Sequence, residues 1–403
     1  MSHFLTVSPR DPIIARDGRP FGATQGRRMK SLGWPYPSVL AGSLRTLLGK
    51  NIEPTFSADT VGALKEIEIA GPLPLVGNQL YFPAPKDFLL RDEPDRTSFA
   101  ARPSPIDREA GEGCDLPESE LLPVLLPETA GDDFKPGKVP AFWSARRMRE
   151  WLLDPTGALF QAPPKDPNSA SGFLDSPPKD ERMHVVIEPQ TGAAKEGLLY
   201  MTVGLALDQE DLLAARVECK MAARVECRSD SAFAAALCTL DAFYSFGGER
   251  RLARFKSHDL AKAWACPDDV QAALRESPRV RLVLATPALF KNGWKPAWLD
   301  HRLEGQPPGA GVTLKLVGAC LDRWRPISGW SLETGRLGPK AVRRLAPAGS
   351  VYFFEVTDKA DLSQLAQKLW LRSVCDDDQD QRDGFGLALW GVWDPFVKVH
   401  QGK

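Results

Sequence analysis

Residues 38–48 carry the pattern that most constrains this chain, an apolar stripe at the spacing of an α-helix. Its members stand at positions i, i+4, i+7 and i+8: Leu40, Leu44, Leu47 and Leu48. Side chains at this spacing share one helix face, which needs a core to cover it. Two prolines, Pro35 and Pro37, hold the preceding residues extended. Ser38 is therefore expected to cap the helix, and Gly49 to end it in a left-handed conformation.

A basic loop, residues 16–30, leads into this helix. Its only acidic residue is Asp17, and its cations are Arg16, Arg19, Arg27, Arg28 and Lys30. The helix face opposite the leucines carries Gly42, Ser43 and Arg45, which are small or basic, so another backbone could approach it. This combination favours a polyanion over a metabolite as the ligand. A plain loop followed by an ordinary core helix is the alternative.

Length and composition indicate a globular protein of two or three domains. The chain has 403 residues, 43% of them hydrophobic, and 11 tryptophans. No apolar run reaches the roughly 18 residues of a membrane span, and the first residues do not resemble a secretory signal. The seven cysteines form no C-x-x-C pair and are expected to be reduced thiols of a cytoplasmic protein. The net charge of −1 means that any case for nucleic acid depends on local clusters.

The first half of the chain predicts a ferredoxin-like unit with a large insertion. Strands are expected at 3–7, 67–76 and 80–82, helices at 142–153 and 233–243, a hairpin at 183–207, and a basic strand after the glycines at 247–248. The resulting order is β-α-β-β-α-β, interrupted by a segment rich in proline, glycine and acidic residues. The repeat AARVEC, at 214–219 and 222–227, is interpreted as a duplication within an extended edge. Prolines at 72 and 74 suit an edge or a bulge.

The second half repeats this order more weakly. Strands are expected at 280–286, 312–321, 350–356 and 387–392, with a helix at 362–371. The predicted class is therefore α+β, with two tandem ferredoxin-like (RRM-like) domains. The first covers residues 1–262 with its insertion at about 88–180, and the second covers 275–403.

Motifs for catalysis and for metal binding are weak. The segment 42–50 has neither the glycine spacing nor the hydroxyl of a phosphate-binding P-loop, and the five histidines are not spaced as metal ligands. His258 and Asp259 could form a base-and-orienter pair, although a surface pair is the plainer interpretation. No cofactor is predicted.

Glycine loops with basic neighbours recur along the chain, at 16–30, 247–251 and 329–344, and a fourth glycine loop lies at 381–386. Such loops expose backbone N–H groups to phosphates, and arginine adds forked donors. On RRM-like domains this pattern favours single-stranded RNA. The candidate RNA contacts are the five cations above, with Ser38, Gly42, Ser43, Arg45, Gly247, Gly248, Arg250, Arg251, Trp330, Lys340, Gly384 and Gly386.

Several of these segments together resemble a known family. RDGRPF at 16–21 and PSVLAGSLRT at 37–46 are similar to the N-terminal signature of the RAMP proteins of CRISPR effectors. ISGWSL at 327–332, PK at 339–340 and PAGSVYFF at 347–354 resemble the third-subunit family of the type III-B (Cmr) complex. The glycine motifs at 247–250 and 384–386 stand where that family has its own.

This resemblance implies a non-catalytic subunit of antiviral defence that binds the 5′ tag of the CRISPR RNA (crRNA). Its expected partners are the large polymerase-like subunit and the other RAMP subunits of the Cmr complex. A thumb-like hairpin would reach the duplex of guide and target RNA, and it would be either the hairpin at 183–207 or part of the insertion after Phe88. The alternative is a metal-independent endoribonuclease that cuts repeat RNA, using Tyr36 or His258. Against it, the motif helix lacks the histidine found in RAMP relatives that cut.

Overall fold

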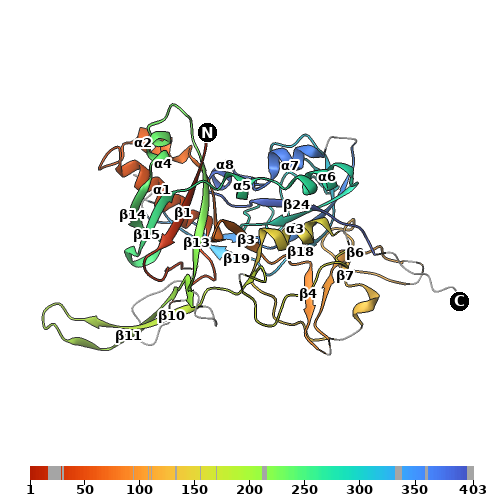
Figure 1. The fold of residues 1–403 in the computed structure, drawn as a ribbon, viewed down its shortest axis with the longest axis horizontal. Helices are drawn as coiled ribbons and strands as arrows, with labels where there is room; N and C mark the ends of the chain where they lie inside the picture. Colours follow the sequence, from red (N-terminus) through yellow and green to blue (C-terminus); the bar gives the residue numbers. More distant parts are fainter. Residues whose placement is uncertain are drawn as a thin grey trace.

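Two antiparallel sheets lie side by side and form a mixed α/β structure (Figure 1). The computed structural model describes residues 1–16, 29, 31–93, 95–107, 109, 111–131, 134–154, 156–168, 170–210, 216–331, 338–358 and 362–396. In order across the first sheet lie β14 (Asp241–Ser245), β15 (Leu252–Ser257), β1 (Ser2–Pro9), β13 (Arg216–Glu226), β2 (Glu68–Val76), β3 (Gln79–Pro83), β8 (Phe142–Ser144) and β9 (Phe173–Leu174), with β12 (Asp208–Glu210) paired to β13. In order across the second lie β17 (Glu304–Gly305), β18 (Leu314–Cys320), β23 (Val351–Val356), β16 (Arg279–Leu284) and β24 (Ala388–Val392).

Helices and small hairpins complete the fold. The helices are α1 (Pro37–Lys50), α2 (Ala58–Lys65), α3 (Ala145–Leu153), α4 (Ala232–Cys238), α5 (Ala261–Trp264), α6 (Asp268–Glu276), α7 (Ser363–Leu369) and α8 (Asp378–Arg382), with 3₁₀ turns η1 (Glu128–Ala130) and η2 (Gly248–Arg250). The hairpins are β4 (Phe88–Arg91) with β5 (Thr97–Ala100), β6 (Arg102–Pro103) with β7 (Val124–Leu125), β10 (Lys179–Ile187) with β11 (Ala194–Leu205), β19 (Arg325–Ile327) with β22 (Arg343–Leu345), and β20 (Trp330–Ser331) with β21 (Gly338–Pro339). Among the described residues, no helix is long and apolar enough to cross a membrane.

Helix α1 confirms the apolar stripe and corrects both predicted ends. The four leucines are buried, each 5% exposed or less. The helix begins at Pro37, whose fixed φ suits the first helical position, so Tyr36 is the N-cap and Ser38 lies inside the helix. Gly49 also lies inside it, and a methyl group at Gly49 would stand 2.7 Å from Leu64 Cδ1 of α2. This glycine therefore allows close helix packing instead of ending the helix.

The remaining elements follow the predicted order with three corrections. Residues 142–144 form strand β8, and α3 starts only after Ser144, whose hydroxyl accepts from the Arg147 amide. The helix predicted at 233–243 ends at Cys238, because the next residues pair as β14. The second AARVEC copy lies in β13 at the centre of the sheet, between β1 and β2, and not at an edge. Helices α2, α5, α6 and α8 had no sequence prediction.

Of the two positions predicted for these prolines, an edge or a bulge, the structure shows a bulge in β2. The register between β13 and β2 shifts between Ala222 and Arg224, which pair with Leu73 and Ala70. Gly71 and Pro72 fall between these paired residues, because proline has no N–H to give to the ladder.

The proline-rich segment after β4 forms short strands and packs on the second sheet. Its Leu122 amide donates to Val317 O at 2.8 Å, and a methyl group at Gly318 would meet Pro103 and Val124. Helix α3 also contacts β24 of the second sheet. The segment that interrupts the first unit is therefore attached to the second, and the predicted domain boundaries remain predictions.

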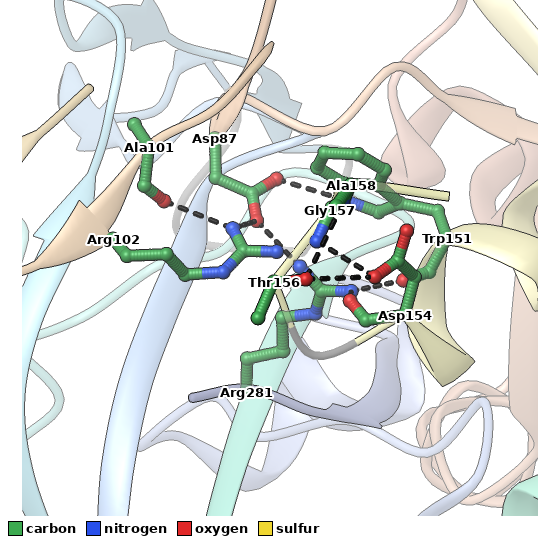
Figure 2. Close-up of polar contacts among 9 residues, drawn as sticks. All are labelled: Asp87, Ala101, Arg102, Trp151, Asp154, Thr156, Gly157, Ala158 and Arg281. Carbon is green, nitrogen blue, oxygen red and sulfur yellow. Dashed lines mark hydrogen bonds and ion pairs between the residues drawn. The ribbon is translucent and has the colours of Figure 1, made fainter. Parts of the chain in front are cut away.

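A fully buried charge cluster makes this attachment (Figure 2). The Asp87 carboxylate accepts from Arg102 Nη1 and Arg281 Nη1, both at 2.8 Å, and from Trp151 Nε1 at 3.0 Å. Arg281 also donates to the main-chain oxygens of Trp151 and Asp154. The side chains of Asp87, Arg102 and Arg281 are 0% exposed. Burial lowers the pKa of both arginines, and Asp87 opposes that shift.

Asp154 supplies the second negative charge of the cluster. It is 5% exposed, and its carboxylate accepts the amides of Gly157, Leu159 and Phe160 at 2.7–3.1 Å. Two arginines and two aspartates thus leave no net charge within the cluster. The cluster joins β4, β6 and the end of α3 to β16, so it holds the segment 87–160 on the second sheet.

We expect Asp87→Ala to lower the free energy of unfolding by about 3–5 kcal/mol, because it leaves two buried guanidinium groups without their carboxylate. Chemical denaturation measures the loss. The matched control is Asp322→Ala, which removes an exposed ion pair with Lys86 at 2.7 Å and should cost less than about 1 kcal/mol. Equal losses in the two variants would show that the buried cluster has no special role.

Candidate nucleic-acid interface

The described residues on either side of the basic loop meet at a root formed by residues 13–16, 29, 31 and 32. The Leu32 amide donates to Ala15 O at 2.7 Å, and Arg16 pairs with Ser31 across an isolated bridge. The Met29 amide donates to Met201 O of β11 at 2.9 Å. The loop root is therefore fixed against the base of the β10/β11 hairpin, with Arg16 exposed.

The second glycine loop packs against the same root. The Gly248 amide donates to Ile14 O at 2.7 Å, and a methyl group at Gly247, where φ is +78°, would stand 2.5 Å from that oxygen. Arg250 is exposed, while Arg251 pairs with Glu249 at 3.2 Å. Glycine is needed here for close backbone approach, and this approach brings two of the predicted basic loops together.

A groove of roughly 340 Å³ extends from this root across to the second sheet. One wall is residues 32–37, which follow the basic loop, and Trp34 Nε1 is fixed there by Pro72 O at 2.9 Å. The other wall contains Arg325 and Leu345 of the β19/β22 hairpin. Much of the groove lining is proline, so it is largely apolar: Pro35, Pro37, Pro72, Pro74, Pro83, Pro85, Pro140, Pro287 and Pro347. The charged residues of the lining are Lys86, Asp322 and Arg325.

The third predicted loop, 329–344, overlaps what we call the basic arm, residues 323–329 and 338–345. Strands β19 and β22 pair, and the Lys340 amide donates to Gly329 O at 2.8 Å. Lys340 is exposed. In the described part of the chain, the ends of the first predicted loop and the second loop thus lie at the loop root, and the arm lies at the groove through Arg325 and Leu345.

The fourth loop, 381–386, is instead part of a seam between the two sheets. Gly384 and Gly386 have positive φ, as predicted, but both are buried. Their amides donate to Gln381 O at 3.0 Å and Pro287 O at 2.8 Å. A methyl group at Gly384 would stand 2.4 Å from Ile69 O of β2. Because no N–H is left for a phosphate, we remove both glycines from the set of RNA contacts.

Arg45 also belongs to the seam. Its guanidinium forms an ion pair with Asp383 and donates to Ile67 O at 2.7 Å and Arg382 O at 3.1 Å. The side chain is 12% exposed, so its predicted place on a free helix face is wrong. The partner lies 338 residues away in the chain, which no local pattern reveals.

Further charges line the seam at a polar pocket of roughly 310 Å³. Glu226 pairs with Arg372 at 2.7 Å and with Arg224 at 3.3 Å, and Arg224 donates to Leu371 O at 2.8 Å. Burial lowers the pKa of Arg224 to about 10, and the charge of Arg372 acts in the same direction. These arginines therefore hold β13 to the segment 371–372.

The other predicted contacts are distributed as follows. Gly42 is exposed with no atom near its missing side chain, Ser38 is half-buried, and the Ser43 hydroxyl donates to Ser245 O. Arg19, Arg27, Arg28, Lys30 and the side chain of Trp330 lie outside the described residues.

The sequence prediction missed Arg323, Trp324 and Arg325, which lie at the start of the arm and are exposed. The run Arg-Trp-Arg was a usable signal, because a tryptophan between two cations suits a charged surface better than a core. The predicted loop began at residue 329 and therefore excluded it.

The two residues considered for catalysis, His258 and Tyr36, lie in different surroundings. His258 is exposed and its Nε2 lies 3.0 Å from Asn78 Oδ1, which confirms the surface position of His258 and Asp259. Tyr36 is 8% exposed and lies on the groove wall. Across the described ranges, no three His, Cys, Asp or Glu side chains are grouped as metal ligands. All seven cysteines are free thiols.

Comparisons with known proteins place the chain in a family. A family model described as "CRISPR-associated protein (Cas_Cmr3)" matches residues 5–393. No curated protein matches the sequence. Among solved structures, a chain of the Type III-B Cmr-beta complex bound to cognate target RNA and AMPPnP is similar at 15% identity and a TM-score of 0.43, over 87% of this chain and 86% of that one. A chain of the Csm3–Csm4 subcomplex of the type III-A interference complex is similar at 10% identity and a TM-score of 0.40, over 87% and 92%.

We expect Gly384→Ala to destabilise the fold by more than about 2 kcal/mol, because strain at φ +89° adds to a clash with Ile69 O. Gly293→Ala is the matched control: its φ is +78°, but nothing lies within 4 Å, so strain of about 1 kcal/mol is the whole cost. Thermal unfolding compares the two. A Gly384→Ala protein as stable as the control would contradict the close approach of the sheets.

We also expect the seam to weaken in acid. Burial works to raise the pKa of Glu226, but the hydrogen bond and charge of Arg372 and the charge of Arg224 leave it below its usual 4.5. A depressed carboxyl pKa stabilises the fold above the unfolded value and loses that effect as pH falls through the folded one. Glu226→Gln should cost about 1–3 kcal/mol at pH 7.

The difference between Glu226→Gln and the parent protein should shrink as the pH falls below 4.5. Urea unfolding across that range measures it, with the exposed Glu276→Gln as control. A difference that persists undiminished in acid would show that the charge of Glu226 is not what holds the seam.

Proposed function

Because this chain belongs to the Cas_Cmr3 family of CRISPR-associated proteins, we propose that it binds the 5′ tag of the crRNA in a type III-B effector of antiviral defence. The observation that carries the proposal is the position of the basic segments beside one groove. The 247–248 loop packs on the loop root at Ile14, residues 32–37 after the basic loop form one groove wall, and Arg325 and Leu345 of the arm form the other. Backbone amides and arginines suit phosphates, and apolar walls suit unpaired bases.

The proposed partners are the large polymerase-like subunit and the other RAMP subunits, within the cytoplasm. The family resemblance supports them. The β10/β11 hairpin is the better candidate for the thumb that meets target RNA, because it projects from the body of the molecule (Figure 1). Its exposed apolar side chains are Met183, Val185, Ile187 and Leu199.

We propose a binding subunit without catalytic activity. A metal-independent endoribonuclease needs an acid and a base that both reach the scissile phosphate. Tyr36 is nearly buried, and His258 is exposed beside Asn78. A nearly buried Tyr36 hydroxyl is poorly placed to reach a phosphate, and the neighbour of His258 is an amide oxygen, not a carboxylate.

The finer fold assignment, two tandem ferredoxin-like units, also belongs to this proposal. Its support is the strand order. Across the first sheet, four strands lie in the order β15, β1, β13, β2, which is 4-1-3-2 when they are numbered along the chain. Across the second sheet, β24, β16, β23 and β18 lie in the same 4-1-3-2 order. All these neighbours are antiparallel, as in a β-α-β-β-α-β unit.

RNA binding should be salt-dependent and centred on the loop root. With a fluorescein-labelled RNA that carries the repeat-derived tag, the logarithm of the binding constant should fall linearly with the logarithm of salt concentration. Arg16→Ala/Arg250→Ala should lower the slope by about 1.4, which is about 0.7 for each lost phosphate contact on a single strand. Fluorescence anisotropy at several salt concentrations measures it.

The control is Lys262→Ala/Arg275→Ala, which removes two exposed cations from α5 and α6 and should leave the slope unchanged. A slope that falls equally in both double variants would mean that only net charge matters. A slope that falls in neither would move the RNA site away from the loop root.

A further inference from the structure

We propose that the basic arm is a stacking site for an unpaired base of single-stranded RNA, with Trp324 as the platform and Arg344 as its clamp. This inference rests on the proposed RNA binding and adds a second contact to it. Trp324 is 54% exposed, and the guanidinium carbon of Arg344 lies 4.8 Å from the centroid of its ring. Among the described large apolar side chains, Trp324 is the one exposed tryptophan. A guanidinium on one ring face leaves the other face for a base.

The backbone of the arm fixes this arrangement. In the register of β19 and β22, Pro326 pairs with Arg344, so the two share one face of the hairpin. Trp324 stands two residues before Pro326 and falls on that same face. Arg343 points to the opposite face, where it donates to both oxygens of Asp380 at 2.7 and 2.8 Å. Asp380 is 5% exposed, so this pair anchors the arm to α8.

The charge of the arm selects a polyanion. Arg323, Arg325, Lys340 and Arg344 are all exposed. Within the described ranges, no carboxylate lies within 4.0 Å of any of the four. The adjacent acid, Asp322, is already paired with Lys86 at 2.7 Å. In the seam, by contrast, Arg45 and Arg372 have carboxylate partners. Unpaired cations beside an open aromatic ring match phosphate and base together.

The arm continues the path of the groove. Arg325 and Leu345 form one groove wall, and residues 32–37 after the basic loop form the other. A strand whose phosphates contact the loop root can cross the groove and place a base on Trp324. The arm therefore favours a single strand over a duplex, because a paired base has no free face for the ring.

The test is binding of the full-length protein to a labelled single-stranded RNA carrying the repeat-derived tag and to the same RNA in a duplex. Trp324→Ala should weaken single-strand binding about 5- to 100-fold, since one base–aromatic stack is lost. Trp324→Phe should restore most of it. Phe243→Ala is the control. Phe243 is 55% exposed on β14, an edge strand of the first sheet, and its loss should not affect binding.

A second measurement is independent of folding. Ultraviolet cross-linking to RNA substituted with 5-iodouridine should label the peptide that contains Trp324. The same peptide of the Trp324→Phe protein should be labelled less. If wild type binds the single strand but Trp324→Ala binds equally well and no cross-link forms on the arm, the arm is not an RNA site and the proposed function survives. If wild type binds no RNA, both proposals fail. If Trp324→Ala loses duplex and single-strand binding equally, the stacking role is overturned.

Discussion

The buried cluster of Asp87, Arg102 and Arg281 is the interaction on which the rest of the structure depends. Opposite charges without water attract strongly, but each costs several kcal/mol to bury, so removing one partner leaves the others buried without compensation. Here it is closed by Trp151 and by the backbone at Asp154 (Figure 2). It holds the segment 87–160 on the second sheet, and this contact positions residues 83–86 of the groove wall.

The charged residues then separate into two groups by their partners. Those of the seam, such as Arg45 with Asp383 and Arg372 with Glu226, neutralise one another between the sheets. Those of the arm, such as Arg323 and Arg344, face solvent with no carboxylate nearby among the described residues. Unlike the seam cations, the second group can attract a polyanion without first breaking the fold, as can the exposed Arg16 and Arg250 at the loop root. A net charge of −1 conceals this separation, which is why composition alone did not indicate RNA.

The sequence predicted elements with strong local patterns and missed contacts between distant segments. The leucine stripe of α1, the long hairpin and the four central strands of each sheet follow from local patterns, whereas β8 and part of β14 were predicted as helix. Gly384 had the correct backbone conformation but the wrong role, because a positive φ serves a phosphate loop and a close sheet contact equally well. Arg45 was assigned to RNA for a similar reason: its partner is far away in the chain. The family resemblance identified the RAMP class where periodicity could not.

Hydrogen exchange with and without tag-bearing RNA tests the central claim most directly, because it reports on every segment at once. The account predicts that RNA protects the amides of the loop root near Met29, of the groove wall at 32–34, and of the arm at 323–329 and 338–345. The seam, including Phe385 and Gly386, should be protected equally in both states, since its buried backbone lies outside the proposed RNA contacts. New protection confined to residues 381–386, with none on the arm or the loop root, would contradict the division between a structural seam and an RNA-binding groove.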